Sequence, residues 1–114
     1  MLPRKYRLDL ARSFPRFKKY ALSIKTPFFT LLWLPKKVPF TTQVGFVVSN
    51  RIGKAVVRNQ SRRLLREAIY QNLSILPAEV DLILIASPRT HEATVEVLKS
   101  NIASALNMVG KQTR

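Results

Sequence analysis

Four stretches of the chain are rich in β-branched, aromatic or other apolar residues, and each predicts a strand. Residues 28–34 (FFTLLWL) stand between two prolines and precede residues 41–50 (TTQVGFVVSN), and we expect this pair to form an antiparallel hairpin. Residues 80–87 (VDLILIAS) are almost wholly apolar, which is typical of a central strand buried on both faces. Residues 21–26 predict a short edge strand.

Helical patterns lie on both sides of these strands. Residues 13–20 predict one or two helical turns after a basic arm at residues 2–8, and Pro15 limits where the helix can begin. Beyond the apolar strand, Thr90 is the expected N-cap of a last helix, and Gly110 is its expected end. The pattern contains no internal repeat, so we predict a single compact α+β domain that spans the 114 residues of the chain.

The helix expected between the strands at residues 41–50 and 80–87 has two unlike faces. It runs from residue 51 to about residue 71, with Ser49 or Asn50 as its cap and Gly53 giving the backbone room at its start. At 100° per residue, positions four apart lie on one face. The polar face carries Lys54, Arg58, Asn59, Arg62, Arg63 and Arg66. The packing face carries Val57, Ser61, Leu64, Leu65 and Ala68.

The net charge of +14 is confined to the first two-thirds of the chain. Residues 1–73 hold 16 Lys and Arg against Asp9 and Glu67, whereas residues 74–114 hold four Lys and Arg against four Asp and Glu. An excess of positive charge destabilises the folded protein by self-repulsion. A polyanionic partner that neutralises this charge is therefore the simplest explanation for its presence. Nucleic acid is the favoured partner, and an anionic membrane surface is the alternative.

Composition disfavours several other classes. The chain has no cysteine and so no disulfide or thiolate metal site, which suits a reducing cytoplasm. The longest apolar run, residues 26–35, is about half of the ~20 residues that a membrane-spanning helix needs. The basic start has no apolar segment of the secretory kind. A transit peptide is also basic, but Asp9, Pro15 and the aromatic residues there favour a folded segment.

The arginine-rich helix face favours phosphate binding, because the planar guanidinium can hold two phosphate oxygens at once. Two other interpretations stay open: a solvated surface, which usually mixes both signs of charge, and a helix lying on a membrane, which needs a larger apolar side. A helix that reads DNA usually belongs to an all-helical or zinc-stabilised module. This helix is instead predicted beside strands, and the sequence has no zinc ligands, so RNA is favoured over DNA. Four aromatic residues could then stack on unpaired bases or belong to the core: Phe14, Phe17, Phe29 and Trp33.

The stretch SNRIGKAVVRNQSRRLLREAI, residues 49–69, resembles the signature of the bacterial ribonuclease P protein family. The opening MLPRKYRL, the following pair SF and RF, and VDLILIASP are similar to that family's arm, first helix and last strand, so the resemblance covers nearly the whole chain in order. Gln60 stands where the family usually has arginine, which removes one charge from the RNA-binding face. Ser61 stands where the family usually has an apolar residue, which suggests slightly looser packing of the helix.

The resemblance implies an α-β-β-β-α-β-α fold in which the basic helix makes an unusual left-handed crossover between central strands. It also implies a cytoplasmic subunit of ribonuclease P, without an obligate protein partner, that binds the catalytic RNA and the single-stranded 5′ leader of precursor tRNA. That RNA, with magnesium ions, removes the leader by endonucleolytic cleavage. The protein is therefore expected to hold no cofactor of its own and to supply no catalytic residue.

The same resemblance assigns residues to two sites. The residues matched to the RNA-binding motif are Arg51, Lys54, Arg58, Asn59, Arg62, Arg63 and Arg66. Those matched to a leader cleft between the first helix and the sheet are Phe14, Phe17, Phe29, Leu31 and Trp33. Phe14 and Phe17 are three residues apart, where the family more often has four, and the sheet face that lines the cleft is left open.

Two other functions compete with this interpretation. A ribosomal or ribosome-assembly protein would share the charge and bind structured RNA without any enzyme activity, so only its partner would distinguish it. A protein-only ribonuclease would need clustered carboxylates to hold its metal ions. The six acids are instead scattered along the chain, and His91 is the single histidine. We therefore expect neither a metal site nor a catalytic group in this chain.

Overall fold

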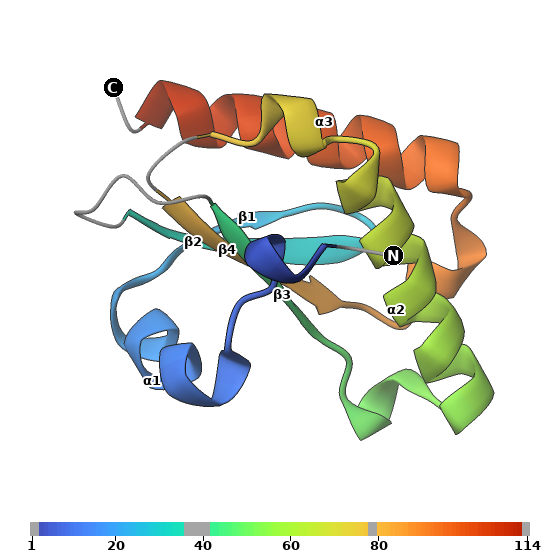
Figure 1. Ribbon diagram of the computed structural model, residues 1–114. Helices are drawn as coiled ribbons and strands as arrows, with labels where there is room; N and C mark the ends of the chain where they lie inside the picture. The colour runs from blue at the N-terminus through green and yellow to red at the C-terminus, as the bar shows by residue number, and fades with distance from the viewer. Residues whose placement is uncertain (1–2, 36–41, 78–79, 113–114) are drawn as a thin grey trace.

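The computed structural model describes residues 3–35, 42–77 and 80–112, which form a four-stranded sheet with helices on both faces (Figure 1). The strands are β1 (Leu22–Lys25), β2 (Phe29–Pro35), β3 (Gln43–Val47) and β4 (Val80–Ala86). The helices are α1 (Leu10–Tyr20), α2 (Ala55–Tyr70) and α3 (Val95–Gln112). Short 3₁₀ turns are η1 (Arg4–Tyr6), η2 (Asn50–Ile52), η3 (Leu73–Ile75) and η4 (Thr90–Glu92). The order of helices and strands confirms the predicted fold class.

The strands lie in the order β1-β2-β4-β3, so β4 is central and β1 is at an edge, as predicted. β2 pairs antiparallel with both β1 and β4, whereas β3 pairs parallel with β4. The predicted hairpin of β2 with β3 is therefore wrong. β4 is the most completely buried strand, and it takes the interior position between the two strands that were expected to pair.

α2 joins β3 to β4, which are neighbouring parallel strands, and it thereby forms the expected crossover. β3 lies at the edge of the four-stranded sheet, so the crossover does not connect two central strands. Its left-handed sense stays a prediction. The N-terminal arm runs beside this edge: Arg7 forms an isolated parallel bridge with Val44, and Leu8 N donates to Val44 O at 3.0 Å.

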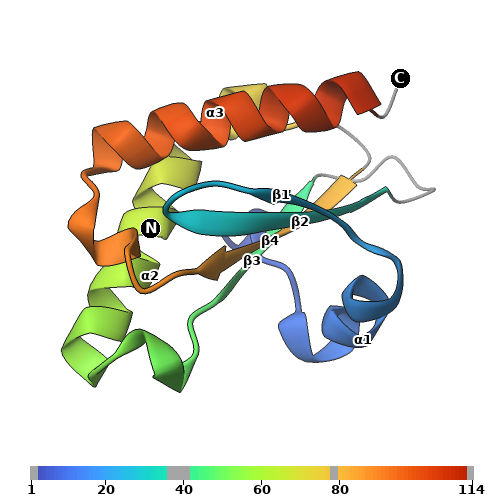
Figure 2. The ribbon, with the colours of Figure 1, turned by 180° about the vertical axis from the view of Figure 1, so that it is seen from behind.

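The larger core lies between one face of the sheet and the pair α2 and α3 (Figure 2). Alternate strand residues point to this face, so the cross-strand pairs Leu31 with Leu84 and Trp33 with Leu82 both contribute to it. The buried helix residues that complete it are Leu65, Ala68, Ile69, Leu98, Ile102, Ala105, Leu106 and Val109. α2 is therefore fixed by its apolar side, which leaves its other side available.

α1 covers part of the opposite face of the sheet (Figure 2). Its Phe17 is buried and packs in one cluster with Ile83 of β4. The helix begins at Leu10, three residues earlier than predicted, because Asp9 caps it by accepting a hydrogen bond from Arg12 N at 3.3 Å. The helix also continues through its proline, which was expected to limit where it begins.

α2 begins later than predicted and ends where expected. Ser49 and Asn50 do not cap it, because the chain first forms η2 and then turns at Gly53. Gly53 has a φ of 144°, a value that favours glycine, so the predicted role of this residue at the junction is confirmed. Lys54 occupies the N-cap position, and Gln71 is the C-cap.

α3 extends further than predicted and has a different cap. Thr94 Oγ1 accepts a hydrogen bond from Val97 N at 3.2 Å, whereas Thr90 belongs to η4 and donates its hydroxyl to Phe28 O. Gly110, the expected end, lies within the helix. Of the helices in the described ranges, none is long and apolar enough to cross a membrane.

Candidate nucleic-acid interface

α2 has the two faces that its sequence predicts. The side chains buried against the rest of the protein are Ser61, Leu65, Ala68 and Ile69. Ser61 is accommodated there because its hydroxyl donates to Val57 O at 2.9 Å. Leu64 and Val57, which were also predicted for this face, are half-buried. The buried side chains therefore define the packing face of α2, and the cationic residues lie on the rest of its surface.

The seven residues assigned to the RNA-binding motif lie on α2 or directly before it. Four are exposed: Arg51, Lys54, Asn59 and Arg63. Three are half-buried: Arg58, Arg62 and Arg66. A row with a period of four drifts around a helix that has 3.6 residues per turn, and the later members of this row turn toward β3. We call these seven residues the α2 cationic face.

Two asparagines orient arginines of the α2 cationic face. Asn50 Oδ1 accepts a hydrogen bond from Arg58 Nη1 at 2.6 Å, and Asn59 Oδ1 accepts one from Arg62 Nη1 at 3.3 Å. The sequence indicated Asn50 only as a helix cap. Its contact with Arg58 was missed because it depends on how η2 folds back beside α2, which residue spacing does not reveal.

The positive charge of the α2 cationic face is not balanced by nearby acids. Glu67, the acid within α2, accepts a hydrogen bond from Gln71 Nε2 at 3.1 Å. In the part of the chain that the structure describes, no carboxylate forms an ion pair with an arginine of α2. Like charges four residues apart on a helix repel each other, so an anion at this surface would relieve the repulsion as well as bind.

The structure separates the residues that were predicted to line a leader cleft. Phe29, Leu31 and Trp33 are only 1%, 0% and 2% exposed, and they lie in the core beneath α2 and α3. Phe14 and Phe17 lie with α1 on the opposite side of the sheet. The prediction that the three β2 residues line a cleft is therefore wrong. Strand alternation places the three residues on one face of the sheet, but the sequence does not reveal which face the long helices cover.

The sheet surface beside α1 is made by the alternate positions of the same strands. Thr30 and Leu32 of β2 and Ile85 of β4 are half-buried on this side. From α1, Phe14 is also half-buried, and Lys18 Nζ lies 5.6 Å from the centroid of its ring. This surface, which we call the α1 face, combines apolar side chains with a cation and an aromatic ring.

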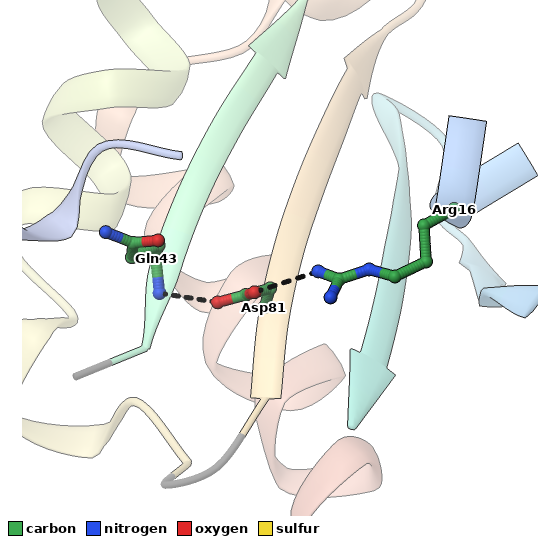
Figure 3. A network of polar contacts seen from close by, with 3 residues as sticks. All are labelled: Arg16, Gln43 and Asp81. Carbon is green, nitrogen blue, oxygen red and sulfur yellow. Dashed lines mark hydrogen bonds and ion pairs between the residues drawn. The ribbon is translucent and has the colours of Figure 1, made fainter. Parts of the chain in front are cut away.

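Arg16 ties α1 to the middle of the sheet (Figure 3). Its Nη2 lies 3.3 Å from Asp81 Oδ2, while Asp81 Oδ1 accepts a hydrogen bond from Gln43 N at 3.2 Å. The Asp81 side chain is 6% exposed and that of Arg16 is 48% exposed. One buried carboxylate thus joins α1, β4 and β3, and it holds α1 at a fixed place over the α1 face.

A cavity of about 310 Å³ lies between the N-terminal arm, β3 and α2. Its lining residues are Arg7, Leu8, Leu10, Val44, Gly45, Phe46, Arg62 and Arg66. Gly45 lets the end of the arm and the start of α1 pass close to β3, since a Cβ atom there would lie 2.6 Å from Leu10 Cδ2 and 3.5 Å from Leu8 Cβ. Arg7 therefore lines the same cavity as Arg62 and Arg66 of the α2 cationic face, a proximity that the sequence did not predict.

Acidic and histidine side chains are dispersed in the structure. Among the described residues, no three His, Cys, Asp or Glu side chains gather as metal ligands would. Asp81, which is buried, is engaged by Arg16 and by the backbone of Gln43. His91 lies half-buried in η4. The groups that the structure does bring together are cations, apolar side chains and amides, which can bind a polyanion.

The family model Ribonuclease P matches residues 2–110. The chain belongs to the ribonuclease P protein family. The matched region begins in the arm and ends within α3, so it includes both the α2 cationic face and the α1 face. The resemblance that the central motif carries is thereby confirmed along almost the whole chain.

Two relatives are ribonuclease P protein components. That of Desulfovibrio desulfuricans is 33% identical over 84% of this chain, and the aligned part is 75% of the relative. That of Thermus scotoductus is 38% identical over 87% of this chain, and the aligned part is 57% of the relative. The chain thus spans three-quarters of the first relative and somewhat more than half of the second.

Solved structures of ribonuclease P proteins have the same fold. The Thermotoga maritima protein is 25% identical, has a TM-score of 0.77, and is matched over 88% of this chain and 94% of its own. A Staphylococcus aureus ribonuclease P protein mutant, described as having defective mRNA degradation activity, is 25% identical with a TM-score of 0.79, over 91% of this chain and 87% of its own.

Family membership also gives the chain a role. The family is that of the protein component of ribonuclease P, a ribonucleoprotein endoribonuclease that processes the 5′ end of tRNA. In such an enzyme the RNA subunit performs the cleavage. The cationic and apolar surfaces of this chain suit a component that binds RNA, which is the part that falls to the protein.

Proposed function

We propose that this protein binds the catalytic RNA of ribonuclease P through the α2 cationic face and holds the single-stranded 5′ leader of precursor tRNA against the α1 face. The observation that carries the proposal is the α2 cationic face itself, six basic side chains and Asn59 on and beside one helix without an acidic partner among the described residues. Family membership supports the choice of RNA.

The electrostatics of the α2 cationic face favour a phosphate backbone. Arginine can grip two phosphate oxygens with one guanidinium, and Asn50 and Asn59 hold two of the arginines in place beforehand. Each phosphate contact releases condensed counterions, so about six contacts make affinity fall roughly a thousandfold between 50 and 200 mM salt. Gln60 lies exposed within α2, where it can donate a hydrogen bond but adds no charge.

The α1 face suits a single strand rather than a duplex. Unpaired bases can lie against apolar and aromatic side chains, and Phe14 with the half-buried side chains of β2 and β4 offers such a surface. Lys18 beside Phe14 is placed to neutralise a phosphate of the same strand. The α1 face replaces the core residues Phe29, Leu31 and Trp33 in our assignment of the leader site.

The chemistry of cleavage belongs, in this proposal, to the RNA subunit and its magnesium ions. The protein contributes binding energy and position, which raise the fraction of precursor held in the cleavable arrangement. Neutralising crowded phosphates with arginines also lowers the concentration of magnesium that the complex requires. We place the complex in the cytoplasm, where tRNA precursors are made, with catalytic RNA and precursor tRNA as its partners and no obligate protein partner.

The proposal is tested by cleavage of a precursor tRNA with a labelled leader at low magnesium. Four reactions are compared: no addition, protein alone, bacterial ribonuclease P RNA alone, and both together. We expect cleavage to be much faster with both, and absent with protein alone. If the protein binds RNA tightly and leaves the rate of cleavage unchanged, the ribosome-associated alternative replaces this proposal. Cleavage by the protein alone would instead make it a nuclease.

A further inference from the structure

The two edges of the sheet differ in how their backbone is covered. At the β3 edge the N-terminal arm pairs with the strand, since Leu8 N donates to Val44 O. β1 forms the other edge, and Figure 2 shows α3 on one side of this strand and α1 on the other. The backbone groups on the outer side of β1 are therefore the ones that need a partner or water.

The hydrogen bonds of the hairpin that joins β1 to β2 determine which backbone groups of β1 point outward. Thr26 N donates to Phe29 O at 2.9 Å, so these two residues form a hydrogen-bonded pair. Hydrogen-bonded and non-hydrogen-bonded pairs alternate along antiparallel strands. Lys25 and Ser23, one and three positions before Thr26, belong to the non-hydrogen-bonded pairs of the register. Their N–H and C=O groups point away from β2, and within the described ranges they have no hydrogen-bond partner.

The side chains of β1 present two different surfaces to a strand that would lie beside it. Leu22 is 51% exposed and Ile24 is half-buried, and both lie on the side of the larger core. Ser23 and Lys25 are exposed on the side of α1. Because directly opposite residues of neighbouring strands share a face, an added strand would meet apolar side chains on one face and a lysine on the other.

The charge at this edge discriminates between occupants. Lys18 and Lys19 are exposed in the last turn of α1, directly before β1, and Lys25 forms no ion pair within the described part of the chain. A second copy would bring the same lysines, and two chains of net charge +14, to one edge, which repulsion opposes. A segment with acidic residues would instead be attracted to it.

We propose that β1 binds an extended segment of a partner protein as an additional strand, in which acidic residues alternate with apolar ones. Backbone hydrogen bonds join the segment to Ser23 and Lys25. Its acidic side chains lie beside Lys25, and its apolar side chains lie beside Leu22 and Ile24. The α2 cationic face belongs to other elements of the fold, so this inference does not depend on RNA binding.

The test is a titration of the full-length protein with a short peptide in which Glu and Val alternate, followed by the backbone amide NMR signals. The four residues of β1 make the contact short, and NMR detects weak binding. The amides of Ser23 and Lys25 should shift and exchange more slowly with solvent. The amides of Leu22 and Ile24, which bond to β2, should change less. A peptide that leaves the Ser23 and Lys25 amides unchanged would overturn the proposal.

Two methylated peptides separate strand pairing from attraction by charge. In the proposed register each Glu lies opposite Ser23 or Lys25, so the Glu amides face β1 and the Val amides face away. Methylation of the Glu amides should weaken binding about tenfold or more, as roughly expected for two lost backbone hydrogen bonds. Methylation of the Val amides preserves the same charges and should leave binding within about twofold. Equal binding of the two methylated peptides would overturn the proposal.

Matched variants locate the site on the protein. Lys25→Glu and Lys99→Glu make the same change of charge on β1 and on the exposed side of α3. Lys25→Glu should weaken binding of the alternating peptide about fivefold or more, and Lys99→Glu should leave it within about twofold, since only Lys25 lies opposite an acidic side chain. Ser23→Pro repeats the test on the backbone, because it removes an outward N–H and no hydrogen bond to β2. Equal losses in Lys25→Glu and Lys99→Glu would overturn the assignment to β1.

A second copy of the chain is the competing occupant. Solvent exchange of the Ser23 and Lys25 amides is therefore also measured in the free protein at a low and a high concentration. Fast exchange at both concentrations is expected for an edge that awaits a partner of another kind. Protection that rises with protein concentration would show that β1 pairs with itself, and it would overturn the proposal.

Discussion

Arg16 of α1 and Asp81 of β4 form an ion pair in which the carboxylate is buried and the guanidinium is half exposed, with 3.3 Å between Nη2 and Oδ2. Asp81 also accepts the hydrogen bond of Gln43 N, so the carboxylate serves two neighbours on different elements. α1 otherwise touches the sheet mainly through one small apolar cluster around Phe17. The position of α1, and hence the shape of the α1 face, depends on this carboxylate.

Substitutions at the two ends of this ion pair should differ in their effect on the free energy of unfolding. Asp81→Ala leaves Gln43 N without that acceptor and should cost about 1–3 kcal/mol. Arg16→Ala removes a half-exposed partner and should cost less, about 1 kcal/mol or below after solvent screening. Asp81→Asn, which keeps an acceptor, should fall between them. Urea unfolding measures all three, and a larger loss for Arg16→Ala than for Asp81→Ala would contradict this ranking.

The two phenylalanines of α1 should separate stability from substrate binding. Phe17 is 2% exposed in the core, so Phe17→Ala should lower the free energy of unfolding by about 3–5 kcal/mol. Phe14 is half-buried, and Phe14→Ala should weaken binding of precursor tRNA by roughly fivefold or more, as expected for one stacked base. Binding of mature tRNA, which has no leader, serves as the control. Equal losses on both RNAs would remove Phe14 from the leader site.

Two glycine-to-alanine substitutions should have opposite signs. At Gly45 a Cβ atom would lie 2.6 Å from Leu10 Cδ2, so Gly45→Ala must displace the Leu10 side chain at the start of α1 and should destabilise the protein by about 1–3 kcal/mol. Gly110 lies inside α3 with nothing within 4 Å of the added atom. Gly110→Ala should therefore stabilise by about 0.5–1 kcal/mol through helix propensity. Thermal unfolding compares them, and a neutral Gly45→Ala would show that Leu10 does not pack against β3 as described.

The sequence predicted those parts of the fold that depend on local pattern. The apolar run that became β4 was correctly placed at the centre, and the order of helices and strands was correct. Strand pairing was not predictable in the same way, because hydrogen bonds between strands join residues far apart in sequence, as in the parallel pairing of β3 with β4 across α2. The caps at Asp9 and Thr94 were missed because several polar residues near each helix start could equally serve.

For the candidate site too, the sequence predicted the features that depend on local spacing and missed those that depend on the tertiary fold. Periodicity alone placed Arg58, Arg62 and Arg66 on one side of α2, since the spacing of a helix fixes which residues share a face. The contact of Asn50 with Arg58 and the approach of Arg7 to α2 required the tertiary fold. The choice of face on β2 required knowledge of where α2 and α3 pack, and that is why core residues were first assigned to the leader site.

The central claim is that the α2 cationic face binds the catalytic RNA, and the salt dependence of that binding tests it most directly. Affinity for ribonuclease P RNA is measured between 50 and 200 mM salt for the unmodified protein, for Arg58→Gln with Arg62→Gln, and for Lys99→Gln. Each phosphate contact contributes about 0.7–0.9 to the slope of log affinity against log salt. Lys99 is exposed on α3, so it provides a control for general charge.

We predict that the double variant binds the RNA more weakly at low salt and has a slope smaller by about 1.4–1.8, whereas Lys99→Gln keeps the slope of the unmodified protein. The difference between these variants separates a specific contact surface from diffuse attraction by a highly basic chain. An unchanged slope in the double variant, or an equal reduction in Lys99→Gln, would contradict the assignment of α2 as the surface that holds the catalytic RNA.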